Sequence, residues 1–595
     1  MTSDVVGVET GALIDEIGAM EARGDSAAAL DLALTALEGS PQDPELIAVT
    51  CGLLDSWERF DESLAIVDGA TGLDPRQAAV LRAATYGAMN SLGEALALSR
   101  EIHRADPTDR RARFDYVRML IRTGEFDEAD REIAEFAAIH PRGNHWKLRI
   151  HCLNAQQRRF EGLEVAEEAW STRPGKVDCL RTVLRQLHKC IQKDRSVAAR
   201  HRAKELLDGL GAEPVADTNS LRLFIRLAVS LGRDEQAKQL LASDTARSRP
   251  GYFRRERAWV AAEAGQVDEA RRIWDEIRTT EPVPTIRPCR PDELDRLDRH
   301  PIPEPAGEIR LFTVIRNERW RLPWFLDHYR ALGVDRFFFV DNDSTDGSRE
   351  WLLTQPDVHV FHTTTPYAIG RSGMVWVNHL VGAFATDGWF MYVDVDEALV
   401  FDGVETRGLR DLTAYMEREG HDMATGQMID MFSVEENGIP AGGFEHDFIA
   451  RYPHFDLSYE RTPTVQCPYF FTSGGIRRLV GTGENQTKTP LIRGGRNIQF
   501  LSSSHIVTPG VVSDAEVALL HFKLAGDYRA QFRDDGEAND RVGECRLRYQ
   551  AYADFFESWA GGADAVASSS TTVRYASSRS LVDVGLLAPL PDGST

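Results

Sequence analysis

A chain of 595 residues is too long for one hydrophobic core, so at least two domains are expected. Hydrophobic residues make up 42% of the chain and charged residues 27%, which is the composition of an ordinary globular protein. Its net charge of -23 at pH 7 argues against nucleic acids and anionic membranes as general partners.

The sequence also predicts where the protein resides. It contains no run of about 18 apolar residues that would span a membrane. The N-terminus lacks the basic start and apolar block of a secretory signal, so we expect a cytoplasmic protein, either free or held at the inner face of the membrane by a partner. Seven scattered cysteines without a CxxC pair favour reduced thiols over disulfides or a zinc site.

Residues 1–280 are predicted to form helices that repeat along the chain. Breaks that contain proline recur at intervals of 34, 32, 34 and 33 residues, at Pro41, Pro75, Pro107, Pro141 and Pro174. Tight turns with a glycine and acidic residues lie between these breaks or continue the series, as in GEFDEA at 124–129 and GRDEQA at 232–237. Two helices per unit at this period resemble the tetratricopeptide repeat.

This resemblance implies an all-α superhelical array. One helix pair cannot bury its apolar face alone, so neighbouring pairs stack into a solenoid. Its concave surface would hold a peptide or a partner protein. The alternative is a scaffold that only shields and orients the rest of the chain, and the sequence names no ligand.

A proline-rich segment follows the repeats. Seven prolines occur in the 24 residues from Pro282 to Pro305. Proline fixes φ and removes a hydrogen-bond donor, so we expect a semi-rigid, extended linker over 281–307.

After the linker, short apolar runs alternate with amphipathic helices. The expected strands lie at 311–315, 336–340, 358–361 and 389–393, and the expected helices at 320–332, 347–353 and 373–384. This alternation predicts an α/β domain over 308–560 with a Rossmann-like, mostly parallel sheet. Ligands of such sheets bind beyond the carboxyl ends of the strands.

Acidic residues follow three of these strands. They are Glu318, Asp341 and the run Asp394-Val395-Asp396-Glu397. Carboxylates at i and i+2 of a strand point to one face, so Asp394 and Asp396 can share one hard divalent cation that bridges to a diphosphate. Such a cation would neutralise the charge that builds on a leaving nucleoside diphosphate.

Three segments carry a more specific resemblance. Ile315-Arg-Asn-Glu318, VDNDSTDGS at 340–348 and VDVDEA at 393–398 are similar to the family 2 glycosyltransferases of the GT-A fold, over about 311–556. This implies a metal-dependent transfer of a sugar from a nucleotide-sugar, UDP-linked donor to a glycan or protein acceptor, with inversion.

The resemblance also implies donor contacts. Asp341 would contact the nucleobase, and Glu318 the nucleoside or its binding loop. Arg371, in a Gly-Arg-Ser-Gly turn, would meet phosphate or base. The family often has two successive acidic residues where this chain has Asp341-Asn342-Asp343, so the role of Asp343 at the nucleotide sugar stays open.

The implied cofactor is Mn²⁺ or Mg²⁺. Asp396 would be its main ligand, while Asp394 would hold either the ribose or the metal. Enzymes of this fold commonly add a late histidine to the metal shell. His521, at a predicted strand end, is the first candidate, and His505 is the second.

Two further residues are assigned to the reaction. An inverting transfer needs a carboxylate that takes the acceptor's proton, and Asp430 is the first candidate for this base. Its competitors are Glu435, Glu436, Glu445 and Asp447. Lys488 lies in a segment similar to one in the family, and its cationic side chain would pair with the diphosphate.

Three interpretations of the chain remain open. The first is an active glycosyltransferase fused to repeats that bind a partner. The second is a repeat-based scaffold with a degenerate transferase domain. The third, a nucleotidyltransferase, is disfavoured because the loop at 316–321 lacks the glycines that cradle a triphosphate. The Gly/Ala/Ser-rich stretch from Ala560 predicts a flexible tail over 561–595.

Overall fold

The computed structural model describes most of the chain. The described residues are 3–23, 26–57, 59–89, 91–141, 143–193, 196–210, 215–264, 266–280, 287–367, 369–433, 448–463, 470–480, 484–501, 503–526, 549–555 and 571–591. The four competitors of Asp430 for the role of base, which lie within 434–447, fall outside them.

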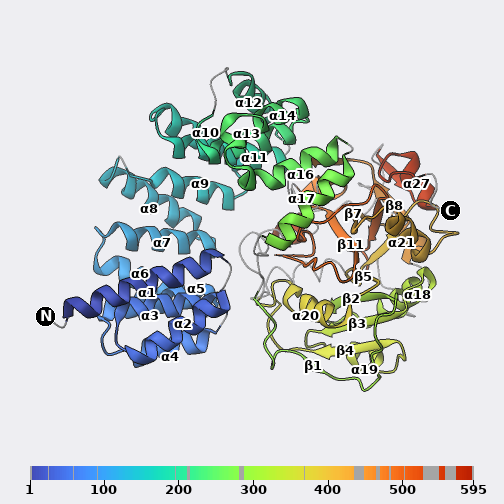
Figure 1. The fold of residues 1–595 in the computed structure, drawn as a ribbon, viewed down its shortest axis with the longest axis horizontal. Coiled ribbons are helices and arrows are strands. Elements are labelled where there is room, and N and C mark those ends of the chain that lie inside the picture. Colours follow the sequence, from blue (N-terminus) through green and yellow to red (C-terminus); the bar gives the residue numbers. More distant parts are fainter. Residues whose placement is uncertain are drawn as a thin grey trace. The chain divides into compact units, whose positions relative to one another are not determined.

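The first part of the chain is helical, as the repeat pattern predicts (Figure 1). Its helices are α1 (Ser3–Arg23), α2 (Ser26–Gly39), α3 (Pro44–Ser56), α4 (Phe60–Gly69), α5 (Pro75–Ala88), α6 (Leu92–Ala105), α7 (Arg110–Thr123), α8 (Phe126–Ile139), α9 (His145–Ala155), α10 (Arg159–Ser171), α11 (Val177–Lys193), α12 (Val197–Asp208), α13 (Thr218–Ser230), α14 (Asp234–Leu241), α15 (Asp244–Arg247), the 3-10 helix η1 (Pro250–Phe253), α16 (Arg254–Glu263) and α17 (Val267–Thr280).

Several breaks between the repeats place aspartates at helix starts. Asp43 and Asp74 precede Pro44 and Pro75, and each accepts hydrogen bonds from two backbone N–H groups of the following helix. Asp109 caps α7 in the same way. These caps fix where each helix begins, and the apolar faces of successive helices then meet. One such cluster, from α7, α8 and α9, contains Tyr116, Val117, Leu120, Ile133, Phe136, Leu148 and Cys152.

The second part of the chain contains a nine-stranded sheet, in the order β1-β4-β3-β2-β5-β11-β7-β12-β6. Its strands are β1 (Asp295–Arg296), β2 (Ile309–Ile315), β3 (Arg336–Asp341), β4 (Val358–His362), β5 (Trp389–Tyr392), β6 (Glu397–Val400), β7 (Met423–Asp430), β11 (Thr487–Arg493) and β12 (Val517–His521). Two small sheets pair β8 (His454–Asp456) with β13 (Thr572–Arg574) and β9 (Tyr459–Pro463) with β10 (Phe470–Gly474).

The predicted α/β architecture is confirmed, and the four predicted strands are β2, β3, β4 and β5. These four strands are parallel to their neighbours in the order β4-β3-β2-β5. The rest of the sheet is mixed. Strand β11 runs antiparallel to β5 and β7, and β12 runs parallel to β7 but antiparallel to β6.

Helices cover both faces of the parallel strands. They are α18 (Leu322–Leu332), α19 (Ser348–Leu352), α20 (Met374–Phe384) and α21 (Leu409–Arg418). Phe337 and Phe339 share a core with α18 and α21, while Phe338 stacks on Phe384 of α20 with ring centroids 5.3 Å apart. Successive side chains of a strand point to opposite faces of the sheet, so both faces here are apolar. This is why these strands appear in the sequence as continuous hydrophobic runs.

The described chain forms two compact units, one based on Met1–Cys179 and one on Leu180–Glu281, Pro288–Arg541 and Cys545–Thr595. Helices α11 to α17 therefore belong to the unit of the sheet, whereas the sequence places the boundary at 280. Packing explains the difference, because α13 contacts β9 and Arg200 of α12 forms an ion pair with Glu460 of β9 at 2.6 Å. Helical periodicity alone does not reveal such a contact.

The segment predicted as a linker over 281–307 is partly built into the sheet. Strand β1 pairs with β4, and Asp298 accepts a hydrogen bond from the Val360 amide at 3.0 Å. Glu293 accepts a bond from the indole N–H of Trp376 at 2.8 Å. Prolines are compatible with an edge strand, so their density did not exclude a packed segment over 287–300.

The predicted flexible tail differs from the structure over 571–591. Strand β13 pairs with β8, and the Ser578 hydroxyl at the start of α27 (Ser578–Asp583) donates to Glu405 at 2.8 Å. Leu581 and Leu587 are buried in a core with β6, β7 and β12. The Gly/Ala/Ser-rich composition belongs to the residues before 571, and the apolar residues after it give this segment a face to bury.

Among the helices of the described residues, none is long and apolar enough to cross a membrane.

Candidate active site

The acidic run 394–397, here called the acidic turn, connects β5 to β6, and Glu397 is the first residue of β6. The amide of Glu397 donates to the carbonyl of Asp394, and the amide of Asp394 donates to the Glu397 carboxylate, each at 3.0 Å. The Glu397 side chain is fully buried, while the side chains of Asp394 and Asp396 are 38% and 16% exposed. The two aspartates therefore remain accessible at the end of a buried strand.

Asp396 meets His521 at this end of the sheet. His521 ends β12 and lies in register with Asp430, which ends the parallel strand β7. Its Nδ1 donates to an oxygen of Asp430 at 2.5 Å, and its Nε2 lies 3.3 Å from an oxygen of Asp396. Burial lowers the pKa of His521, but Asp396 and Asp430 outweigh it and raise the pKa to about 8.

Asp430 is buried and fully engaged. Arg477, at the start of the short helix α23 (Arg477–Val480), grips both of its carboxylate oxygens at 2.7 and 2.9 Å. Gln486 donates to the carboxylate at 3.3 Å, and the backbone amide of Asp430 donates to the hydroxyl of Tyr459. Burial raises the pKa of Asp430, but the Arg477 guanidinium and His521 hold it well below its usual range.

Lys488 is directed at the acidic turn. Its ammonium lies 2.5 Å from Asp394 and 2.7 Å from Glu397, and its side chain is 2% exposed. The second oxygen of Asp394 accepts a bond from the Tyr392 hydroxyl at 3.0 Å. Burial raises the pKa of Glu397 to about 7 although Lys488 opposes the shift.

Glu318 follows β2, and its carboxylate interacts electrostatically with Asp396. Its carboxylate accepts a bond from Arg321 at 2.7 Å. Burial raises the pKa of Glu318, Arg321 lowers it, and the negative charge of Asp396 raises it further. The residue thus belongs to the same electrostatic cluster as the acidic turn.

The loops after β2 and β3 are bound to each other. Ser348 accepts a bond from the amide of Glu318 at 3.0 Å, Asp346 from Arg319 at 2.9 Å and Ser344 from Asn317 at 2.9 Å. These side chains hold the Arg-Asn-Glu loop in place. The following helix α19 has Gly347 as its N-cap, without a side-chain cap bond.

Asp341 and Asp343 occupy different environments. Asp341 is fully buried and pairs with Arg349 at 3.3 Å, while the amide of Ser344 donates to it. Asp343 has a left-handed φ of 60° and an exposed side chain that lies 3.7 Å from His362. Of the two, Asp341 is the one held in a fixed position.

Arg371 lies in a left-handed turn that leads into α20. Arg371, Ser372 and Gly373 have φ values of 51°, 56° and 80°. A side chain at position 373 would meet Val314 of β2 at 2.7 Å, so the turn packs closely against the strand that leads to Glu318. The side chain of Arg371 is exposed.

His505 does not join His521. Its Nδ1 lies 2.9 Å from the carbonyl of Thr487, next to Lys488. Burial, followed by the charge of Lys488, lowers its pKa to about 3.

One group of side chains in the described residues has the donor set of a metal site. Ligand atoms of Asp396, Glu397 and His521 lie within 4.8 Å of one another. Two carboxylate oxygens and an imidazole nitrogen suit a hard or intermediate divalent cation. The predicted ligands Asp396 and His521 are thus brought together, with Glu397 in the group in place of Asp394.

Sequence reasoning missed several partners in this cluster, among them Arg477, Glu397 and Tyr392. Glu397 was visible in the acidic run itself. The pairing of Arg477 with Asp430, 47 residues away, depends on tertiary contacts that no local pattern in the sequence reveals.

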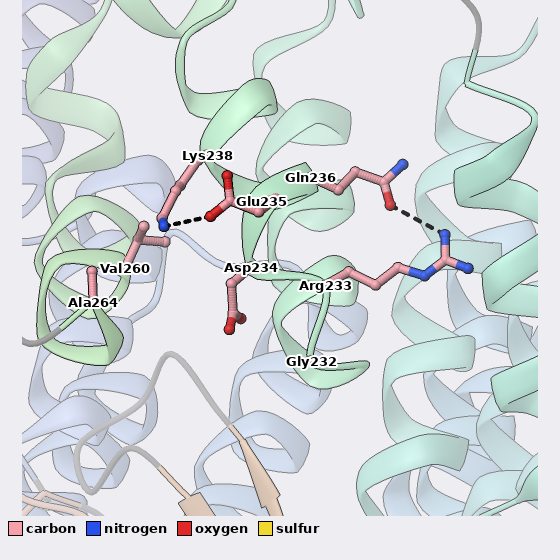
Figure 2. Close-up of a pocket in the computed structure, with 8 residues that line it drawn as sticks. All are labelled: Gly232, Arg233, Asp234, Glu235, Gln236, Lys238, Val260 and Ala264. Carbon is pink, nitrogen blue, oxygen red and sulfur yellow. Dashed lines mark hydrogen bonds and ion pairs between the residues drawn. The ribbon is translucent and has the colours of Figure 1, made fainter.

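A separate pocket of about 450 Å³ lies in the helical part, and none of the predicted site residues lines it (Figure 2). It is lined by Gly232, Arg233, Asp234, Glu235, Gln236, Lys238, Val260 and Ala264. Lys238 and Glu235 pair at 2.7 Å, and Arg233 donates to Gln236 at 3.2 Å. The polar residues belong to one of the repeat turns, and these two pairs link four of them.

Comparison with known proteins adds a distant relative. No family model matches the chain. A glycosyltransferase family 92 protein of Oryza sativa subsp. japonica is 29% identical over 138 residues, which are 22% of this chain and 22% of that protein. The chain thus matches about a fifth of the length of this curated relative. The relative belongs to family 92, whereas the motifs resemble family 2.

Tetratricopeptide repeat proteins are among the solved structures similar to the chain. A thermophilic tetratricopeptide repeat protein of Thermus thermophilus is 18% identical, with a TM-score of 0.26, and the match covers 30% of this chain and 98% of that one. A tetratricopeptide repeat protein of Parabacteroides merdae is 14% identical with the same TM-score, covering 40% and 92%.

Proposed function

We propose that the unit with the nine-stranded sheet is a glycosyltransferase of the GT-A type. It moves a sugar from a nucleotide-sugar, UDP-linked donor to a glycan or protein acceptor, with inversion and with Mn²⁺ or Mg²⁺ bound. The family 92 relative supports glycosyl transfer. The family 2 motifs support the GT-A type, the donor and the inversion.

The observation that carries this proposal is the arrangement Asp396–His521–Asp430. A metal-binding histidine commonly donates its second ring N–H to a carboxylate, which fixes the ring and its tautomer. His521 does so to Asp430 and presents Nε2 to Asp396. When bound, a divalent cation would supply charge stabilisation for the departing nucleoside diphosphate.

Asp430 takes a different role in this proposal from the one expected of it. Its oxygens are committed to Arg477 and His521, so it has little capacity to accept a proton from an acceptor hydroxyl. We assign it the positioning of His521.

The donor would lie along the carboxyl ends of β2, β3 and β5. Asp341 is buried and fixed by Arg349, as a residue that accepts a bond from a nucleobase N–H needs to be. The amide of Glu318 is bonded to Ser348, which follows β3, and its carboxylate interacts electrostatically with Asp396, so Glu318 is assigned to the ribose or its binding loop.

The competing interpretation is a repeat scaffold whose transferase domain is degenerate. Isothermal titration calorimetry with UDP, in the presence and absence of Mn²⁺, distinguishes the two. The transferase predicts UDP binding that requires Mn²⁺, followed by UDP release when a nucleotide sugar of the right kind is supplied. UDP binding that is absent, or equally strong without metal, would favour the scaffold.

A further inference from the structure

A buried lysine pairs with the acidic turn instead of facing a donor. The ammonium of Lys488 lies 2.5 Å from Asp394 and 2.7 Å from Glu397. It also lies 5.9 Å from the centroid of the Tyr392 ring, whose hydroxyl holds the other oxygen of Asp394. Two carboxylates and an aromatic ring therefore surround one cation at the base of the site.

The strand geometry brings Lys488 to this place. It belongs to β11, which pairs with β5 on one side and β7 on the other, and β5 leads directly into the acidic turn. The register between β11 and β7 shifts between Lys488 and Leu491, so the strand is irregular beside the lysine. A fully buried lysine is costly unless it is paired, and this one has two partners.

The Lys488 ammonium consequently separates the acidic residues 394–397 into two sets with different partners. Asp394 and Glu397 face Lys488, whereas Asp396 faces His521. Glu397 lies near both the Lys488 ammonium and the His521 imidazole. One of its carboxylate oxygens pairs with the ammonium, and the other accepts a hydrogen bond from the Asp394 amide. Asp396 and His521 are the members of the cluster that Lys488 does not hold.

We propose that Lys488 is a built-in counter-ion that holds Asp394 and Glu397 and confines a divalent cation to Asp396 and His521. The inference rests on the metal site of the proposed function. It assigns Lys488 to the acidic turn, in contrast to the diphosphate contact expected from the sequence. It also implies one divalent cation at this site, because the ammonium already occupies the space between the other two carboxylates.

Metal affinity should respond to this lysine whether or not any transfer reaction takes place. Replacing Lys488 by methionine keeps most of the side chain's length and removes its charge. Asp394 and Glu397 then become available, and the field around the metal becomes more negative. Mn²⁺ should bind Lys488→Met at least about ten-fold more tightly than the wild type.

The test is isothermal titration calorimetry, in which Mn²⁺ alone is titrated into the full-length protein and its affinity is measured. The matched control is Lys238→Met, which removes a lysine from an exposed pair with Glu235 and changes the net charge equally. Tighter binding in Lys488→Met but not in Lys238→Met supports the proposal. Unchanged or weaker binding in Lys488→Met overturns it.

A second measurement covers the case in which Lys488→Met does not fold. A crystal structure of the wild type with Mn²⁺ should show the ion on Asp396 and His521, with Lys488 still bonded to Asp394 and Glu397. An ion that bridges Asp394 and Asp396, with Lys488 displaced, contradicts the proposal. Because these experiments contain no nucleotide, they remain informative if the proposed donor is wrong, and Mn²⁺-independent UDP binding would refute the function separately.

Discussion

His521 and Asp430 lie side by side on two parallel strands, and their side chains meet at 2.5 Å. The register of β12 with β7 produces this contact, although the two residues are 91 positions apart in the chain. Arg477 holds Asp430 from the other side. The imidazole is thereby turned so that Nε2 faces Asp396.

This relationship predicts the effect of Asp430→Asn. An asparagine preserves the shape but weakens the bonds to Arg477 and His521, so the imidazole loses its fixed tautomer. Mn²⁺ should bind about 10- to 100-fold more weakly. Calorimetry measures the change, with Asp327→Asn as the control because Asp327 is exposed on α18. Equal Mn²⁺ affinity in the wild type and Asp430→Asn would refute the positioning role.

The hydrogen bond between Glu293 and Trp376 predicts that replacing Glu293 lowers the free energy of unfolding. Its carboxylate accepts the bond from the buried Trp376 indole, and Glu293→Ala leaves that N–H without this acceptor. The expected loss is about 1–3 kcal/mol of unfolding free energy. Glu293→Gln keeps an acceptor oxygen and should lose less. Urea unfolding of both variants checks this, and equal losses would speak against the hydrogen bond as the cause.

The pKa of Asp298 predicts a pH dependence of stability. Burial raises this pKa, but bonds from Arg296, His359 and the Val360 amide lower it from 3.8 to about 2. Because the folded pKa is the lower one, the stabilisation is present above about pH 4 and is lost as pH falls towards 2. Asp298→Asn should lack about 2 kcal/mol at neutral pH, and its difference from the wild type should narrow in acid. A difference that stays constant between pH 6 and 3 in urea titrations would contradict this assignment.

The packed C-terminal segment predicts a large effect at Leu581. This side chain is fully buried, and Leu581→Ala should cost about 2–5 kcal/mol because a cavity remains. Val584→Ala is the control, since Val584 is 37% exposed. Denaturant unfolding that shows equal, small losses for both would mean that 571–591 contributes little to the core.

Local patterns were sufficient for some of these features and not for others. Apolar runs and the acidic residues after them located β2, β3 and β5 with the turn at 394–397, because strand period and strand ends are local properties. The partners of Asp430 and Lys488 depend on β11, β12 and α23, which reach the site through tertiary pairing. Composition gave a wrong prediction of a flexible tail over 571–591, because the Gly/Ala/Ser-rich stretch is followed by a segment with its own apolar face.

The most direct test of the central claim is Asp396→Asn, assayed for Mn²⁺ binding and for Mn²⁺-dependent UDP release from a panel of nucleotide sugars. Asp396 is partly exposed, and its contact with His521 is the one that a bound cation would use. We therefore expect the variant to keep its melting temperature within a few degrees and to lose both Mn²⁺ binding and Mn²⁺-dependent UDP release. Wild-type Mn²⁺ affinity and UDP release in Asp396→Asn would contradict the account.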